Sequence, residues 1–160
     1  RRAERSDCSL IMEMIMEQAT AENTPEQVQS SVETLVSDGF DSKPPFFHAL
    51  VATKDNKTIG YAFYYFLYST LEGGKKMYLG ELYIMSDYRC SGYGGRLFEV
   101  LMNVAKAEGC ICMQWHVHQS NTGAMRFYQR YGAIDLTEKD GVHNFRMEKS
   151  AMINWLQNHK

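Results

Sequence analysis

The chain has 160 residues, about the length of one domain. Its residues are 44% apolar, 12% aromatic and 22% charged, a composition that is ordinary for a folded globular protein and excludes extensive disorder. Seventeen Lys and Arg against nineteen Asp and Glu leave a formal charge of −2, whereas proteins that bind nucleic acid normally carry a basic excess. We therefore expect no nucleic-acid partner.

No segment has the composition of a linker, so we expect a single domain over residues 1–160. The longest uninterrupted apolar stretch, Tyr61–Tyr68, is far shorter than the ~20 residues of a membrane helix, and the start of the chain does not read as a signal peptide. Cys8, Cys90, Cys110 and Cys112 form no disulfide framework and no CxxC pair. This pattern is typical of free thiols in a reducing cytosol and predicts a cytoplasmic protein without a membrane partner.

Two helices are expected before the first strand. Apolar residues recur at helical spacing over Asp7–Ala19. Thr24 then precedes Pro25, which suits a first helical position, and Gln27 completes a capping box with Thr24. We expect this second helix to end near Gly39, ahead of two consecutive prolines.

Three strands are expected next. Phe46–Thr53 and Thr58–Tyr68 are rich in aromatic and β-branched residues, and the short polar turn Lys54–Lys57 between them predicts an antiparallel hairpin. A third strand follows over Met77–Met85, where Gly80 indicates a bulge or a close approach of another group.

The second half of the chain alternates helices with strands, which together with the first three strands predicts an α/β (α+β) fold with a mixed sheet flanked by helices. The expected elements are a helix that begins near Leu97 and ends at Gly109, a strand over Ile111–Val117, a helix over Thr122–Tyr131, a strand centred on Phe145–Met147 and a helical tail over Ala151–Gln157.

The segment Tyr88–Arg96 carries the clearest chemical signal. It leaves an apolar strand, passes through closely spaced glycines and opens an amphipathic helix, so several N–H groups and the positive end of the helix dipole point at one spot. A phosphate or pyrophosphate fits there; the alternative is a turn that needs glycine for its geometry alone. The spacing matches neither a P-loop nor a dinucleotide fingerprint. Main-chain donors would then hold the diphosphate, with Arg89 and Arg96 as ionic helpers.

Together, Arg89, Gly92 and Gly94 make the chain resemble the Gcn5-related N-acetyltransferase (GNAT) superfamily, whose acetyl-CoA loop is written Arg/Gln-x-x-Gly-x-Gly/Ala. Asn121 and the helix that carries Tyr128 match a second family feature. The diamine (spermidine/spermine) and thialysine N-acetyltransferases are more similar still, in stretches that include Asp38–Phe40, Tyr64–Phe66, Met85–Arg89, Gly132-Ala133 and Asp135-Leu136. The similarity spans nearly the whole chain, except that Arg1–Arg2 would barely complete the family's first strand, which we expect to be truncated.

This resemblance implies a mostly antiparallel sheet with one splayed strand pair, a homodimer, and acetyl-CoA as co-substrate, with no metal. In that fold the strand near Gly80–Leu82 splays so that free main-chain groups can pair with the pantetheine arm. The cofactor-binding residues it implies are Leu82, Tyr83, Ile84, Arg89, Cys90, Ser91, Gly92, Tyr93, Gly94, Gly95, Asn121, Thr122, Gly123, Ala124 and Tyr128.

Acetyl transfer to nitrogen needs a base and an acid. An amine with a pKa near 10.4 must lose its proton before it attacks a thioester, which at pH 7 costs roughly 4.6 kcal/mol. We assign the base or proton relay to Glu81; the alternative is an exposed strand glutamate without a role. Relatives carry an additional Glu where this chain has Gly80, which favours ordered water as part of the relay. Tyr128 matches the family's tyrosine acid, although by itself it is an aromatic residue of a helix core.

The resemblance also places a cationic acceptor. Glu22 and Asp140 fall on acidic positions of the polyamine site, although Glu22 could equally be a solvated surface charge. Other positions that line this site are Ala21, Gly80, Gln114, Trp115 and His116. Ser69 and Val142 replace an acid and an aromatic of the spermidine/spermine enzymes, which favours thialysine, a lysine-like amino acid or a small diamine over a long polyamine.

Three functional hypotheses follow. The first is an acetyl-CoA-dependent N-acetyltransferase that acts on a small amine by direct transfer in a ternary complex. The second is a non-catalytic, regulatory acyl-CoA-binding domain, which Gly80 would favour. The third keeps the reaction but takes a protein N-terminus or lysine as acceptor. His116 and His118 lack a third ligand at sensible spacing, so we expect no metal.

Overall fold

A computed structural model describes residues 1–137 and 145–158 of the chain. The chain divides into two compact units, Arg1–His116 and Val117–Lys160. None of the helices in the described ranges has the length and apolarity that crossing a membrane needs.

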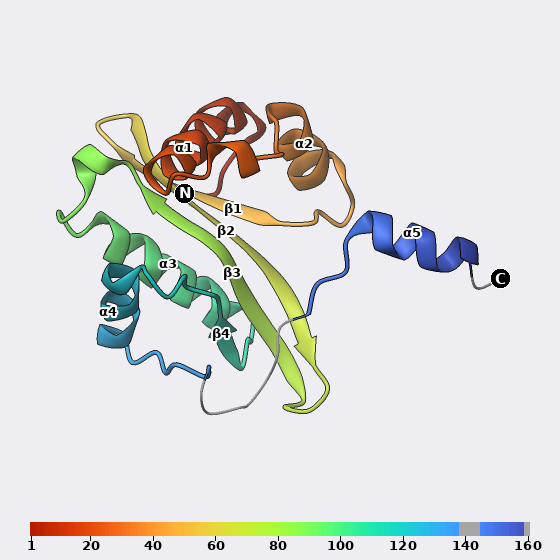
Figure 1. Cartoon of the computed structure of the whole chain (residues 1–160). Coiled ribbons are helices and arrows are strands. Elements are labelled where there is room, and N and C mark those ends of the chain that lie inside the picture. Colours follow the sequence, from red (N-terminus) through yellow and green to blue (C-terminus); the bar gives the residue numbers. More distant parts are fainter. Residues whose placement is uncertain (138–144, 159–160) are drawn as a thin grey trace. The chain divides into compact units, whose positions relative to one another are not determined.

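A four-stranded sheet of order β1-β2-β3-β4 forms the centre of the first unit (Figure 1). β1 (His48–Lys54), β2 (Lys57–Ser69) and β3 (Gly74–Ile84) pair antiparallel, and β4 (Cys112–Gln114) pairs parallel with β3. Asp55 and Asn56 connect β1 to β2 with φ angles of 48° and 61°, the left-handed conformation of a tight hairpin turn. The predicted hairpin and the predicted mixed, mostly antiparallel sheet are confirmed.

Helices cover both faces of this sheet (Figure 1). α1 (Cys8–Ala21) and α2 (Val32–Val36) lie on one face, where a buried cluster joins them to the strands. α3 (Tyr93–Ala107) lies on the other face and buries an apolar stripe at helical spacing. The cluster on the first face consists of Cys8, Ile11, Met14, Leu35, Val51, Tyr61 and Tyr83.

The second predicted helix is wrong in its extent. Thr24 makes no side-chain capping bond, a short 3₁₀ turn covers Pro25–Gln27, and Val28 is extended. The helix starts instead after Ser31, whose hydroxyl accepts a hydrogen bond from the Thr34 N–H at 3.2 Å. Thr24 and Ser31 are both residue types that cap helices and lie seven residues apart; the helix that starts after Ser31 places Leu35 in the core.

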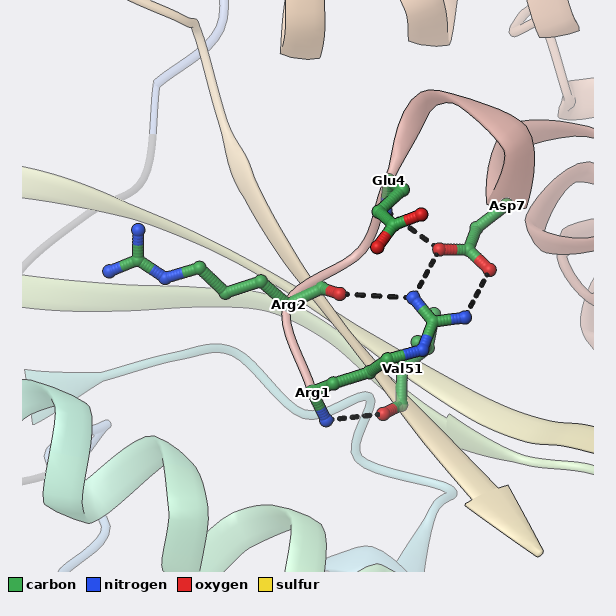
Figure 2. Close-up of polar contacts among 5 residues, drawn as sticks. All are labelled: Arg1, Arg2, Glu4, Asp7 and Val51. Carbon is green, nitrogen blue, oxygen red and sulfur yellow. Dashed lines mark hydrogen bonds and ion pairs between the residues drawn. The ribbon is translucent and has the colours of Figure 1, made fainter. Parts of the chain in front are cut away.

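The first residues run antiparallel to β1 and are tied to α1 by one carboxylate (Figure 2). Asp7 accepts hydrogen bonds from Arg1 Nη1 at 2.7 Å, from Arg1 Nη2 at 2.8 Å and from the Glu4 N–H at 2.7 Å. These hydrogen bonds, above all those from Arg1, hold the pKa of the Asp7 carboxyl below its usual value. The Asp7 carboxylate thereby fixes the start of the chain to the beginning of α1.

Replacing Asp7 by Asn should lower the free energy of unfolding by about 1–3 kcal/mol, since a nearly buried charged acceptor is lost. Because the pKa of Asp7 is lowered on folding, its contribution is present above about pH 4 and disappears as the pH falls further. Urea unfolding at pH 7 and at pH 3 checks both statements. Asp41→Asn, which breaks an exposed ion pair with Arg5, is the control and should cost less than ~1 kcal/mol; equal losses in both variants would contradict the assignment.

The second unit contains α4 (Thr122–Arg130) and α5 (Lys149–Asn158), which confirms the two predicted helices. The predicted strand at Phe145–Met147 is wrong: this segment has no regular secondary structure, and Phe145 is 91% exposed. Apolar residues favour a strand only where a sheet edge accepts their backbone, and no strand of the described residues pairs with this segment.

Candidate active site

A bulge at Gly80 divides β3 into two parts. Phe63 pairs with Glu81 and Tyr64 with Leu79, so Gly80 has no partner on β2, as its position in the sequence predicted. On the opposite edge, pairing with β4 ends at Tyr78 and Gln114. Among the described residues no strand continues along that edge beside Leu82–Ile84, so the edge has no strand partner there and could pair with an extended ligand. The strand expected over Ile111–Val117 is correspondingly short.

Glu81 lies at one end of a chain of polar side chains that connects three elements. Its carboxylate accepts a hydrogen bond from the Tyr61 hydroxyl of β2, and that hydroxyl lies 3.1 Å from Oε1 of Gln18 in α1. Gln18 Nε2 lies 3.5 Å from the carboxylate of Glu22, just after α1. Glu81 is therefore a half-buried, hydrogen-bonded residue rather than an exposed one, and Glu22 is near it.

Burial raises the pKa of Glu81 above its ordinary value, and the nearby negative charge of Glu22 adds to this effect. The hydrogen bond from Tyr61 opposes both, because it favours the ionised carboxylate. Tyr61 itself stays protonated, since burial raises its pKa strongly. A carboxylate with a raised pKa is better matched to accepting a proton near neutral pH than a surface glutamate is.

Aromatic side chains lie beside the bulge at Gly80. Tyr65 stacks on Tyr78 with ring centroids 4.9 Å apart, and Tyr78 contacts His116 edge to face at 5.6 Å and through a hydrogen bond. Gly80 lies beside Tyr65, whose Cε1 would be 3.7 Å from a Cβ at position 80. Trp115, by contrast, packs on Phe98 of α3, so the expected substrate positions 115 and 116 have different surroundings.

The predicted phosphate loop connects β3 to α3. Cys90 and Gly92 both adopt left-handed conformations, with φ angles of 59° and 83°, and the first intrahelical bond runs from the Arg96 N–H to the Gly92 carbonyl. The N–H groups that precede Arg96 in the first turn of α3 have no hydrogen-bond acceptor within the helix. A Cβ added at Gly92 would meet no atom within 4 Å, and one at Gly94 only Ile84 at 3.8 Å, so the space beside both glycines is open to a ligand.

Side chains around the loop fix it and add positive charge. Arg89 Nε donates to the Ile84 carbonyl at 2.8 Å, which ties the loop to β3. Lys54 and Lys57 of the β1–β2 hairpin lie over Tyr88, each with Nζ 5.7 Å from the ring centroid. Lys54 also lies 5.8 Å from the ring of Tyr93 at the start of α3. The main-chain donors, the open cradle and these cations fit a diphosphate ligand.

The remaining predicted residues belong to the second unit. Asn121 caps α4, its side-chain oxygen accepting from the Ala124 N–H at 3.0 Å, and Thr122 and Gly123 are exposed in the first turn. Burial raises the pKa of Tyr128 to about 12, so its hydroxyl carries a proton at neutral pH. Asp140 lies outside the described residues.

A protein-family model described as "Acetyltransferase (GNAT) family" matches residues 11–133. The chain belongs to this family. It is an acetyltransferase with the mixed α/β fold that the order of its elements predicted, and the resemblance stated from the motifs is confirmed.

Relatives with assigned names agree with this membership. Thialysine N-epsilon-acetyltransferase of Mus musculus is 40% identical over 95% of this chain and 93% of its own length, and that of Sus scrofa is 39% identical over the same shares. The human spermidine/spermine N(1)-acetyltransferase-like protein 1 is 31% identical over 96% of this chain but only 23% of its own length.

Solved structures share the fold. An integron cassette protein from V. cholerae superposes with a TM-score of 0.76 at 20% identity, covering 98% of this chain and 96% of its own. An aminoglycoside acetyltransferase from an uncultured soil metagenomic sample, in complex with sisomicin, has a TM-score of 0.73 at 17% identity over 93% and 95% of the two chains.

Several residues of the site are not evident from the sequence. Tyr61, Tyr65, Tyr78 and Gln18 were not among the predicted site residues. Tyr61 and Tyr65 are four residues apart on β2, an even spacing that places side chains on one face of a strand. Which face that is depends on the bulge at Gly80.

Proposed function

We propose that this acetyltransferase transfers the acetyl group of acetyl-CoA to a primary amine of a small cationic substrate, by direct attack in a ternary complex. Candidate acceptors are thialysine or a lysine-like amino acid, a diamine and a polyamine. The observation that carries the proposal is Glu81, a half-buried base linked to Tyr61 beside the Gly80 bulge. Similarity to thialysine acetyltransferases supports the acceptor class.

Acetyl-CoA supplies the thioester when it is bound. The main-chain N–H groups of Cys90–Gly95 would hold its diphosphate, and the free edge at Leu82–Ile84 would pair with its pantetheine arm. Lys54 and Lys57 add positive charge beside the loop. The contribution of Asn121–Ala124 is carried over from the family motif.

In the reaction, Glu81 accepts the proton that the attacking nitrogen loses, directly or through a water at the open Gly80 position. The new N–C bond forms as the C–S bond breaks, and Tyr128 donates its phenolic proton to the departing sulfur. The role of Tyr128 rests on the family motif and on the raised pKa that keeps it protonated. Glu22 and the rings of Tyr65 and Tyr78 favour a cationic acceptor by charge and by cation–π attraction.

Thiol release from acetyl-CoA in the presence of single amines tests the proposal. Thialysine, short diamines, polyamines and lysine-ended peptides form the panel, and we expect release with a small diamine or lysine analogue. Calorimetric binding of CoA without release for any amine would instead favour a non-catalytic acyl-CoA-binding domain. Sedimentation equilibrium would test the homodimer that the resemblance implies.

Replacing Gly94 by Val should weaken CoA binding at least about tenfold while leaving the fold intact, because the new side chain enters the cradle and meets only Ile84 within the chain. Isothermal titration calorimetry with CoA gives the affinity, and thermal unfolding checks the fold. Val100→Ala, on an exposed position of the same helix, is the control. Unchanged CoA affinity in the folded Gly94 variant would contradict the assignment of the loop.

A further inference from the structure

The Tyr61 hydroxyl lies between two hydrogen-bond acceptors but has a single proton to donate. Its oxygen is hydrogen-bonded to the Glu81 carboxylate and lies 3.1 Å from Oε1 of Gln18. Tyr61 is fully buried, so bulk water does not reach this hydroxyl. If Glu81 is ionised and Gln18 presents its oxygen, one of the two contacts brings lone pairs of two oxygens together, which is unfavourable at a buried site.

A protonated Glu81 removes this conflict. The carboxylic acid then donates its O–H to the Tyr61 oxygen, and Tyr61 donates its own O–H to Oε1 of Gln18. The other end of the amide agrees with this direction, because Gln18 Nε2 lies 3.5 Å from the Glu22 carboxylate, which accepts from it. All donors therefore run one way, from Glu81 through Tyr61 and Gln18 to Glu22.

An ionised Glu81 leaves the same chain with one poor contact. Tyr61 must then donate to Glu81, so that only the lone pairs of its oxygen face Gln18. Turning the amide over would present Nε2 to Tyr61, but it would also bring Oε1 against the negative charge of Glu22. Both orientations of the amide oppose the ionised state, so the chain as a whole favours the state in which Glu81 carries the proton.

We propose that Gln18 is a positioning residue that stabilises Glu81 once this carboxylate has accepted the proton of the attacking amine. The inference rests on the proposed function, in which Glu81 is the base. The proton that leaves the amine nitrogen becomes the O–H that Glu81 donates to Tyr61, and Gln18 accepts the hydrogen that Tyr61 then turns away from Glu81. Gln18 needs no contact with either substrate for this role. Proton transfer to Glu81 becomes more favourable, because its product is stabilised.

Other groups around Glu81 also affect its titration. The charge of Glu22, just after α1, raises the pKa of Glu81. Tyr61 on β2 and Tyr83 on β3 are phenols whose pKa values burial raises, so both stay protonated near neutral pH. The charged neighbours of Tyr83 are Glu17 and Arg89. A substitution at position 18 removes none of these groups, so it tests the hydrogen-bond chain itself.

Replacing Gln18 by Met keeps the length of the side chain and removes the amide. Tyr61 then donates to ionised Glu81 without an opposing acceptor, so the titration midpoint of Glu81 should move to lower pH by about 0.5–1 pH unit. ¹³C NMR of the glutamate carboxyl carbons measures this midpoint without turnover, and Glu81→Gln assigns the signal. In thiol release, the acidic limb of kcat/KM should move by the same amount, and its plateau should fall about two- to fivefold.

A double-mutant cycle with Tyr61→Phe separates this route from a general effect on packing. Alone, Tyr61→Phe should move the titration of Glu81 to higher pH, opposite to Gln18→Met. In the Tyr61→Phe background Gln18→Met should cause no further shift, because the amide acts only through the hydroxyl. Gln29→Met, at an exposed glutamine outside the helices and strands, and Glu99→Gln, at an exposed acid on α3, are the controls and should keep the wild-type titration.

An unchanged or higher titration midpoint of Glu81 in folded Gln18→Met overturns the inference, and so does an equal shift in the Tyr61→Phe background. A lowered midpoint with an unmoved acidic limb also overturns it, because Glu81 then titrates without taking part in the reaction. Gln18→Leu, which likewise lacks an amide, replaces the Met variant if that variant does not fold. Absence of thiol release with every amine contradicts the proposed function instead, and the NMR titration still decides whether Gln18 controls the proton on Glu81.

Discussion

Replacing Glu81 by Gln should lower kcat/KM for the amine by about 10²–10⁴-fold, because the variant keeps the shape of the site but loses its proton acceptor. In the wild-type chain kcat/KM should rise with pH as Glu81 loses its proton, above the ordinary range of a glutamate, since burial raises its pKa. In the variant this acidic limb should be absent, leaving only the dependence on the ionisation of the amine. Steady-state thiol release between pH 5 and pH 9 measures both effects.

Tyr61→Phe makes the same assignment testable without removing the carboxylate. The hydrogen bond from Tyr61 favours the ionised form of Glu81, so its loss should move the acidic limb to higher pH. Glu99→Gln should leave both rate and profile as in the wild type. If Glu81→Gln retains the acidic limb and the rate, the proton leaves by another route and Glu81 is not the base.

Tyr128→Phe should lower kcat by about 10²–10⁴-fold, because the departing sulfur loses its proton donor. KM for acetyl-CoA should change much less than kcat, since the ring remains. Burial raises the pKa of Tyr128 to about 12, so the hydroxyl stays protonated and should cause no alkaline loss of rate up to pH 10.

Tyr131→Phe is the matched control, because Tyr131 follows directly after α4 and its ring also contacts Phe127. Circular dichroism should show the same helix content in both variants. A kcat for Tyr128→Phe within about threefold of the wild type would show that the proton comes from solvent or another group.

Local sequence signals predicted the parts of the fold that depend on local geometry. The turn Asp55-Asn56 and the glycine inside an apolar strand each require a particular backbone conformation, and both features are present. The second helix could not be placed, because Thr24 and Ser31 are both residue types that cap helices, and the choice between them depends on the burial of Leu35 in the folded core. The strand at Phe145–Met147 failed for a related reason, since an apolar triplet does not specify a pairing partner.

The candidate site also has one part that the local sequence predicts and one part that depends on packing between distant segments. The loop proposed to bind the diphosphate is one continuous segment, so the spacing of Gly92 and Gly94 was sufficient to locate this turn between β3 and α3. The surroundings of Glu81 come from α1, β2 and β3, and they meet only because the bulge fixes the register of Tyr61 against the end of β3. Register and helix docking are properties of the assembled sheet, which a single sequence does not reveal.

Because residue 80 is a glycine, β3 carries no charged side chain at this point of the site. A Cβ there would lie 3.6 Å from the Phe63 carbonyl and 3.7 Å from Tyr65, both ordinary contacts, so the bulge accepts residues larger than glycine. One codon change could therefore add a second acid beside the nucleophile without altering the backbone. The preference for the acceptor amine could then differ between proteins of this fold through a substitution at position 80, while the residues that bind the acyl donor stay the same.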